Sequence, residues 1–327
     1  MLGRRVLPWL SGSLLIAASA FVLLLDILHP YPKVPPSLTG EQVAHVEGVA
    51  FTINVQGPTV YMGMGSRVWV LQGRDVHHLQ RIGESPRFSG DVLDLEVKDH
   101  YLFVAARDAG IRVLDVSDPA HPQEVGGTYP AAWVEGIALA GDRLYAAATW
   151  GGLVIFDVSR APRLHLMGRL DTPGYARDVT VSGPVALVAD WHGGIRVVDV
   201  SHPDHPREVA ALEGETRPQS VAIRGPIAYV ADGWGLQVID ISDPAVPRVV
   251  KRLLLPAWTV HVALQGDRAY VSARDAGVIV VDVSDPARSH VVGRYATTAA
   301  AVQVVPVPPY LYIAQEMNGL LILREQE

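Results

Sequence analysis

The sequence predicts an all-β protein: a seven-bladed β-propeller of four-stranded antiparallel blades, preceded by one N-terminal transmembrane helix. Three observations predict this arrangement. A segment of about ten residues that contains a fixed aspartate recurs along most of the chain. Short runs with alternating apolar residues are separated by turns, and the chain contains 30 Gly and 24 Pro. One uncharged apolar run near the N-terminus is long enough to cross a bilayer.

Residues 1–28 form the predicted membrane segment. The 20 residues from Val6 to Leu25 carry no charge, and a helix of that length spans roughly 30 Å, the thickness of the hydrocarbon core. The basic pair Arg4-Arg5 precedes this run and predicts a cytoplasmic N-terminus. A cleaved signal peptide is the alternative, because Ala18-Ser19-Ala20 is similar to a cleavage site. Both interpretations place the bulk of the chain outside the cytoplasm, in the periplasm or at the cell surface.

The next segment and the charge balance also indicate an exported domain. Residues 29–40 contain four prolines and are predicted to form a semi-rigid stalk. Residues 1–40 carry three basic side chains and one acidic one, a net charge of +2, so the total of -7 leaves -9 on residues 41–327. This acidic domain does not favour nucleic acid as a partner. The chain has no cysteine, which excludes disulfides and thiol catalysis, and we expect no cofactor.

Residues 41–327 consist of one repeated unit. In its fifth copy, residues 235–244, the repeated segment reads Gly-Leu-Gln-Val-Ile-Asp-Ile-Ser-Asp-Pro. Its first aspartate recurs at spacings of 42, 42, 41 and 42 residues, at Asp115, Asp157, Asp199, Asp240 and Asp282. Gln72 and Arg324 occupy the same position one period before and one period after this series, which makes seven units. Each unit has room for four short strands, which is one propeller blade.

The two ends of the repeated region are predicted to close the ring. The chain ends in the third strand of the last unit, so that blade lacks an outer strand. An extra run before the first unit, residues 42–47, is predicted to supply it. The recurring aspartates are expected to be structural, because Asp and Ser side chains accept hydrogen bonds from turn amides and proline fixes the bend.

The repeated segment resembles the LVIVD-repeat family. The resemblance is carried by Leu236–Pro244, preceded by Ala228-Tyr229-Val230-Ala231-Asp232, and by the matching segments of four other units. It covers roughly residues 41–327, and the units with Gln72 and Arg324 depart from the motif. The resemblance implies a β-propeller, often exported or located at the cell surface. It implies no catalytic residue, because the activities of the family are mostly unassigned.

Five of the seven tryptophans are predicted to lie on one face of the ring. This top face is made by the turns between the second and third strands of each blade and by the loops that join successive blades. The turns carry Trp150, Trp191 and Trp234, and the loops carry Trp133 and Trp258. Aromatic side chains on one loop face indicate a recognition surface for a protein, peptide or glycan. The alternative is that they cover the ends of the core between blades.

A second group of residues is predicted at the mouth of the central channel. The position before the first apolar residue of each innermost strand holds Thr52, Asp94, Gly136, Asp178, Ser220, His261 and Gln303, with Glu135, Arg177 and His192 nearby. The candidates Asp94, Asp178, His192 and His261 have side chains suited to a metal ion or a polar ligand. A solvated polar channel entrance is the alternative, and because no contiguous ligand motif is present we predict no metal.

These observations predict a membrane-tethered, extracytoplasmic propeller that acts as a non-catalytic binding scaffold. The five top-face tryptophans are the candidates for ligand contacts. The alternative function is an exported lyase or hydrolase with a site built from Asp94, Asp178 and His261. A structural envelope component without a ligand is a third interpretation. The sequence lacks the motifs of serine hydrolases, zinc proteases and phosphate-binding loops.

Overall fold

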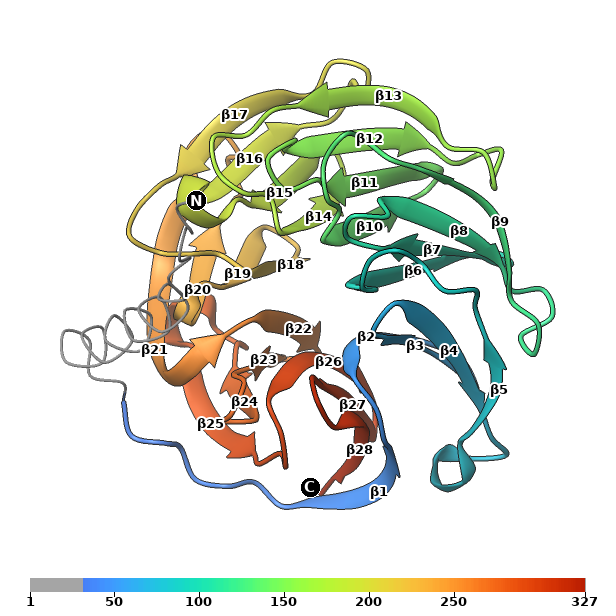
Figure 1. Ribbon diagram of the computed structural model, residues 1–327. Helices are drawn as coiled ribbons and strands as arrows, with labels where there is room; N and C mark the ends of the chain where they lie inside the picture. The colour runs from blue at the N-terminus through green and yellow to red at the C-terminus, as the bar shows by residue number, and fades with distance from the viewer. Residues whose placement is uncertain (1–31, 327) are drawn as a thin grey trace, which may run out of the picture. The chain divides into compact units, whose positions relative to one another are not determined.

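Each unit of about 42 residues folds into four antiparallel strands, because its apolar runs are short and a glycine or proline turn ends each of them. The computed structural model describes residues 32–326, and in it seven such sheets surround a central axis (Figure 1). Each innermost strand contacts the innermost strand of the next sheet, and β26 contacts β2, so the ring is closed. The predicted seven-bladed propeller with four-stranded blades is confirmed.

The blades follow one another along the chain, and their strands are numbered from the axis outward. Blade 1 contains β2 (Ala50–Gln56), β3 (Thr59–Met64), β4 (Arg67–Gln72) and β5 (Gln80–Glu84), and blade 2 contains β6 (Asp94–Lys98), β7 (Tyr101–Ala105), β8 (Ile111–Asp115) and β9 (Gln123–Thr128). Blade 3 contains β10 (Gly136–Ala140), β11 (Arg143–Ala147), β12 (Leu153–Asp157) and β13 (His165–Leu170), and blade 4 contains β14 (Asp178–Ser182), β15 (Val185–Ala189), β16 (Ile195–Asp199) and β17 (Arg207–Leu212).

The second half of the ring has the same order. Blade 5 contains β18 (Ser220–Arg224), β19 (Ile227–Ala231), β20 (Gly233–Asp240) and β21 (Arg248–Thr259), and blade 6 contains β22 (His261–Gln265), β23 (Arg268–Ser272), β24 (Val278–Asp282) and β25 (His290–Tyr295). Blade 7 contains β26 (Ala301–Val307), β27 (Tyr310–Gln315), β28 (Gly319–Glu325) and, as its outer strand, β1 (Gly40–Val46). Three short 3-10 turns, η1 (Val76–His78), η2 (Trp191–Gly193) and η3 (Pro286–Arg288), complete the described elements.

The core consists of seven apolar layers between the blades. Each layer takes side chains from neighbouring sheets, as where Phe103 of blade 2 and Leu144 of blade 3 share one cluster. In blades 2 to 5 the second strand ends in alanine where neighbouring blades converge, and Ala105, Ala189 and Ala231 are fully buried there. Both faces of every blade are therefore covered, which explains why the third strands are almost continuously apolar.

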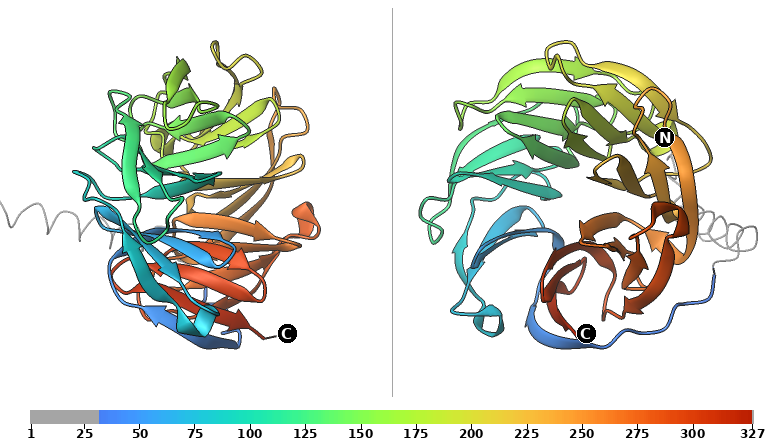
Figure 2. Two further views of the ribbon diagram at one scale, coloured as in Figure 1. Left: turned by 90° about the vertical axis from the view of Figure 1, so that its right-hand side faces the viewer. Right: turned by 180° about the vertical axis from the view of Figure 1, so that it is seen from behind.

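The N-terminal strand of the ring pairs with its C-terminal strand. β1 runs antiparallel to β28, from Gly40 opposite Glu325 to Val46 opposite Leu320, and Figure 2 shows the two strands side by side from behind the ring. This strand occupies the place that the sequence analysis gave to residues 42–47. A closed ring needs no disulfide at this seam, because the blade is completed by main-chain hydrogen bonds between the two ends of the chain.

Part of the predicted stalk also belongs to the ring. The Leu38 N–H donates to the Arg294 carbonyl at 2.8 Å, and the Arg294 N–H donates to the Pro36 carbonyl at 3.0 Å. In blade 3 the equivalent position, Gly168, faces the Pro203 carbonyl in the turn of the next blade, and in blade 6 Gly293 faces Pro36 and Leu38 instead. Residues 36–38 therefore replace a turn that the last blade lacks, and the ring begins earlier than the predicted boundary at residue 41.

The predicted membrane segment, residues 1–28, lies outside the described residues and stays a prediction. Within residues 32–326, no helix has the length and apolar character needed to cross a membrane. Residues from Val34 onward form one compact unit.

The recurring aspartates hold the turn that follows the third strand. In each of five blades, one carboxylate oxygen accepts the backbone N–H of the serine two residues later, at 2.7–2.9 Å. Hydrogen bonds from the side-chain hydroxyl and the backbone N–H of that serine lower the pKa of Asp115, Asp157, Asp199, Asp240 and Asp282. The structural role predicted for them is confirmed, and in blade 1 Gln72 instead donates to the Thr59 hydroxyl at 2.6 Å.

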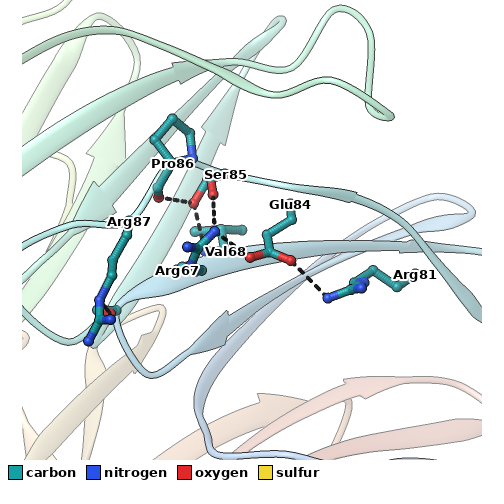
Figure 3. A network of polar contacts seen from close by, with 8 residues as sticks. Arg67, Val68, Arg81, Glu84, Ser85, Pro86 and Arg87 are labelled. Atoms are coloured by element: carbon teal, nitrogen blue, oxygen red, sulfur yellow. Dashed lines mark hydrogen bonds and ion pairs between the residues drawn. The ribbon is translucent and has the colours of Figure 1, made fainter.

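Polar contacts also fix the outer strand of blade 1, which adjoins the seam. Arg67 and Arg81 both donate to the Glu84 carboxylate, and the Ser85 hydroxyl accepts the Val68 N–H at 2.9 Å (Figure 3). The Arg81 guanidinium also lies 4.5 Å from the ring centre of Trp69. Trp69 thus packs at the outside of blade 1 and does not take part in the top-face site described below.

Candidate ligand site on the top face

A pocket of about 440 Å³ opens at the top end of the central channel. Its walls come from the turns and loops of the top face and from the first residues of the innermost strands. The residues lining it include Phe51, Asp91, Asp94, Arg107, Glu135, Arg177, Asp178, Gln219, Ser220, His261, Arg274, Gln303 and Glu316. A second hollow of about 300 Å³ follows below it, lined by the next residues of the same strands, among them Glu96.

Three arginines of the pocket wall each pair with a carboxylate. Arg107 lies 3.5 Å from Asp91, Arg177 lies 3.2 Å from Glu135, and Arg274 lies 2.6 Å from Glu316. The arginine side chains are about a third to two fifths exposed. Since a guanidinium has five N–H donors and each pair uses few of them, donors remain free to face the pocket.

A recurring backbone conformation directs these side chains. The second residue after the second strand has a left-handed backbone in blades 2 to 6, and blade 5 alone uses glycine there. Arg107, Trp191 and Arg274 occupy this position with φ values of 45°, 44° and 43°. Such values are unfavourable for residues with a Cβ and cluster at functional sites. Main-chain bonds hold the turns, as where the Arg274 N–H donates to the Ala301 carbonyl at 3.2 Å.

The five predicted tryptophans form two clusters beside this pocket. In the first aromatic cluster, Trp150 lies between Trp133 and Tyr175, with ring-centre distances of 5.3 and 6.1 Å. In the second aromatic cluster, Trp258 lies between Trp191 and Trp234, at 6.3 and 5.3 Å. The structure thus groups the five tryptophans in two clusters, the first of which includes Tyr175.

Cations of the pocket wall connect the aromatic clusters to the pocket. The Arg107 guanidinium lies 5.5 Å from the ring centre of Trp133, and the Arg177 guanidinium lies 4.8 Å from that of Trp191. Arg217 lies 5.9 Å from the same Trp191 ring. Cation–π contacts of this kind hold both partners in place. The two aromatic clusters and the pocket therefore form one continuous surface over blades 2 to 5.

A buried carboxylate fixes the loop and the turn of blade 4. Asp190 is fully buried and accepts hydrogen bonds from the Thr172 hydroxyl at 2.6 Å and the Gly174 N–H at 2.8 Å. Arg196, also buried, lies 3.6 Å from it. Burial raises the pKa of Asp190, and these donors partly oppose that rise. Because Tyr175 and Trp191 are the next residues of this loop and this turn, Asp190 places both aromatic rings.

Trp234 and Trp258 lie on strands, and their predicted location in a turn and a loop is corrected. β20 and β21 are longer than the matching strands of the other blades, and Gly233 pairs with Thr259. The Asp232 carboxylate accepts the Trp234 N–H at 3.0 Å and thereby fixes the backbone at the start of β20. A Cβ on Gly233, whose φ is +83°, would lie 2.7 Å from the Trp258 indole. The glycine therefore lets the two strands continue and the indole pack on the backbone.

The channel-mouth residues join consecutive blades. Asp94 accepts the Ile137 N–H of the next blade at 2.8 Å, and Asp178 accepts the Val221 N–H at 2.9 Å. Gln303 accepts the Ile53 N–H at 2.6 Å across the seam. Each side chain satisfies a backbone donor at the inner edge of the neighbouring sheet. The residue type differs between blades because carboxylate, hydroxyl and amide oxygens all accept such a bond.

Three carboxyl groups in the channel hold their protons more tightly than usual. Burial raises the pKa of Glu96 to about 7 and that of Asp178 to about 6. The pKa of Asp94 is raised well above its usual value by burial and by the nearby charge of Glu96. Burial lowers the pKa of His261 to about 4, and its Nδ1 has no hydrogen-bond partner among the described residues. The described part of the chain contains no group of three or more acidic or histidine side chains placed to hold a metal ion.

His192 does not reach the channel mouth. It follows Trp191 at the tip of η2, where its side chain is exposed and its ring lies 5.7 Å from the Trp191 ring. The sequence analysis selected it as a neighbour of the channel, but the left-handed residue before it directs the tryptophan inward and leaves the histidine in solvent. Asp94, Asp178 and His261 do line the pocket as predicted.

Sequence reasoning missed several residues of the site. Arg107 and Arg274 were not among the predicted site residues, yet both side chains line the pocket. Their signal was the recurrence of Ala-Arg-Asp-Ala-Gly in two blades, at 106–110 and 273–277. Glu96 lies two residues after Asp94 and therefore on the same face of the strand. This spacing was the signal that predicts Glu96 as a second channel residue of β6.

Comparison with known proteins agrees with the repeat. The family model described as LVIVD repeat matches five times, at residues 89–129, 133–172, 173–212, 217–254 and 258–297. The chain belongs to the LVIVD repeat family. The five matches cover blades 2 to 6, and the two blades next to the seam are the ones that depart from the motif. Among curated proteins no match is found for this LVIVD repeat protein.

Solved structures share the fold of the LVIVD repeat protein at low sequence identity. The computationally designed Ika8 protein is 12% identical, with a TM-score of 0.64 over 88% of this chain and 100% of that one. The Pan2 WD40 domain of Neurospora crassa is 13% identical, with a TM-score of 0.67 over 90% and 98%. Sqt1 of Saccharomyces cerevisiae is 10% identical, with a TM-score of 0.64 over 90% and 99%. At these identities the likeness concerns the fold alone.

Proposed function

We propose that this LVIVD repeat protein is a membrane-tethered, extracytoplasmic propeller that binds a protein, peptide or glycan through its top face without catalysing a reaction. The observation that carries this proposal is the joining of the two aromatic clusters to the channel-mouth pocket. The pocket volume of about 440 Å³ lies within the range of roughly 300–1,000 Å³ that is typical of ligand sites. The apolar N-terminal run at residues 1–28 supports export and tethering.

A role in the core alone does not account for the tryptophans. Trp150 is 52% exposed although it contacts two other aromatic rings. An exposed indole held between neighbours is available to a ligand at little entropic cost, because its position is already fixed. The buried carboxylates Asp190 and Asp232 fix the surrounding backbone in the same way. The top face is therefore a rigid surface with aromatic contacts exposed.

The experiment compares Trp150→Ala with Tyr129→Ala as the matched control. Tyr129 is 53% exposed, is also on the top face, and belongs to neither aromatic cluster as defined here. Labelled full-length protein in detergent is applied to arrays of immobilised glycans and peptides. We expect binding that falls at least tenfold in Trp150→Ala and is retained in Tyr129→Ala. Equal binding by the wild type, Trp150→Ala and Tyr129→Ala, or binding by none of these three proteins, contradicts the proposal.

The alternative of an exported lyase or hydrolase draws support from the raised pKa values of Asp94, Glu96 and Asp178, because such groups occur at catalytic sites. Against it, Asp94 and Asp178 each accept two backbone N–H groups and so serve the ring. Elemental analysis separates the two proposals. A stoichiometric metal that is lost in Asp178→Ala would favour the enzyme.

A further inference from the structure

The side chains that line the top-face site restrict the kind of ligand that it can bind. Its arginines are already paired: the three pocket arginines each have a carboxylate partner within 2.6–3.5 Å. An anionic ligand would compete with those carboxylates, and a cationic ligand would compete with the arginines. A ligand without net charge leaves all three pairs intact and contacts their unused donors and acceptors.

The paired groups alternate with aromatic surfaces. Arg107 lies beside Trp133, and Arg177 lies beside Trp191 while it also pairs with Glu135. A purely apolar ligand such as a lipid chain would cover these ion pairs and desolvate them, at a cost that the aromatic contacts do not offset. The ligand must therefore have apolar faces and polar edges that alternate closely along its length.

A sugar ring has this combination. One face of a pyranose carries C–H groups that stack on an electron-rich indole, and its edge carries adjacent hydroxyls, each both donor and acceptor. Trp150 is the most accessible platform, because it is half exposed and no arginine covers it in the described contacts. Trp191 is less accessible, since Arg177 and Arg217 both lie over its ring.

The second aromatic cluster extends the same pattern. The rings of Trp258 and Trp234 lie 5.3 Å apart on the extended hairpin of β20 and β21. Arg177 lies 4.8 Å from the Trp191 ring of this cluster and also acts electrostatically on Tyr175 of the first cluster. Burial, and then the charge of Glu135, raise the pKa of the Tyr175 hydroxyl, which keeps it a neutral donor. Aromatic platforms on both sides of a polar centre suit a chain of several sugar units.

From this geometry we propose that the top-face site binds an uncharged oligosaccharide, which stacks on Trp150 and on the second aromatic cluster and hydrogen bonds to the Arg107–Asp91 and Arg177–Glu135 pairs. This inference rests on the proposed binding function and selects glycan over peptide. A peptide ligand is the competing outcome and is distinguished by the same experiment.

The test titrates full-length protein in detergent with cellohexaose, chitohexaose and mannohexaose, and separately with hexagalacturonate and a hexapeptide of alternating lysine and glycine. We expect at least one neutral hexasaccharide to bind, with an affinity that changes less than twofold between 50 and 500 mM salt, because screening acts on charged ligands. Trp150→Ala should weaken that binding at least tenfold, and Tyr129→Ala should leave it unchanged.

A second variant tests the charge pairing without altering the aromatic surface. In Glu135→Gln the Arg177 guanidinium loses its carboxylate partner while the shape of the side chain is kept. Binding of hexagalacturonate should then increase by threefold or more, and binding of the neutral hexasaccharide should decrease. Unchanged preference between the two sugars would overturn the role assigned to the pairs.

The outcomes separate the two proposals. Binding only of the charged sugar or the peptide, sensitive to salt and to Trp150→Ala, overturns the oligosaccharide assignment and leaves the proposed binding function standing. Binding of a neutral sugar that is indifferent to Trp150→Ala overturns the site. Failure of every probe to bind overturns both.

Discussion

Replacing Glu96 by glutamine tests whether the channel carboxyls are as buried as the structure indicates. Glu96 faces the channel together with Asp94, Asp178 and His261. Burial raises its pKa from 4.5 to about 7, with a smaller contribution from the charge of Asp178. The folded protein thus binds this proton more tightly than the unfolded chain, so the stability contributed by protonated Glu96 is lost as the pH rises from about 4.5 to 7.

The magnitude follows from the size of the change in pKa. A rise from 4.5 to about 7 corresponds to at most about 3 kcal/mol of unfolding free energy between the protonated and ionised forms. Glutamine keeps the shape of the side chain and never ionises. Relative to the wild type, Glu96→Gln should therefore gain up to about 3 kcal/mol between pH 5 and pH 8. Asp178 changes in the same sense, while His261, whose pKa is lowered to about 4, destabilises the ring as the pH falls from about 6.5 to 4.

The assay is urea unfolding at pH 5, 6, 7 and 8, followed by tryptophan fluorescence and circular dichroism. The difference between variant and wild type reports Glu96 together with its effect on Asp94, whose pKa is raised by burial and by the charge of Glu96. Glu215→Gln, which removes an exposed carboxylate, is the control and should give a difference that does not change with pH. Parallel pH profiles for Glu96→Gln and the wild type would refute the reasoning, because they would place Glu96 in a water-filled channel.

Two further predictions concern closure of the ring. Deleting residues 34–46 removes β1 and the segment paired with Arg294, and should lower the melting temperature by more than 10 °C in calorimetry; an unchanged melting temperature would exclude closure through this strand. Gln303→Ala leaves the buried Ile53 N–H without its acceptor and should cost about 1–3 kcal/mol in urea unfolding, whereas the exposed Gln265→Ala should cost less than about 0.5 kcal/mol. Equal effects of the two substitutions would contradict the inner contact between blades 7 and 1.

The repeat made most of the fold predictable. A fixed spacing of about 42 residues and four alternating runs per unit specify a blade, and the spacing of the aspartates, extended to Gln72 and Arg324, predicts seven blades. The docking of residues 36–38 on β25 was not predictable. It depends on the open position beside blade 6, where the other blades receive a turn from the next blade and the last blade supplies none. The proline-rich composition predicted extension and gave no indication of pairing.

The candidate site was predictable in position and less so in detail. The repeat frame located five tryptophans on one face, and the structure joins them in two clusters. The repeat frame did not show that Trp234 and Trp258 lie on extended strands, because that extension depends on Gly233 and on its main-chain pairing with Thr259. The repeated Ala-Arg-Asp-Ala-Gly segment marked the turns of Arg107 and Arg274, but it did not show that a left-handed backbone directs both side chains into the pocket.

The most direct test of the top-face site follows the seven tryptophan indole N–H resonances of the full-length protein in detergent during titration with the neutral hexasaccharides. Single tryptophan substitutions assign the signals. The account predicts that binding shifts the resonances of Trp150, Trp234 and Trp258 and leaves that of Trp69, on the outside of blade 1, where it was. Shifts at Trp69 with none at Trp150, or no shift at any of the seven, would contradict it.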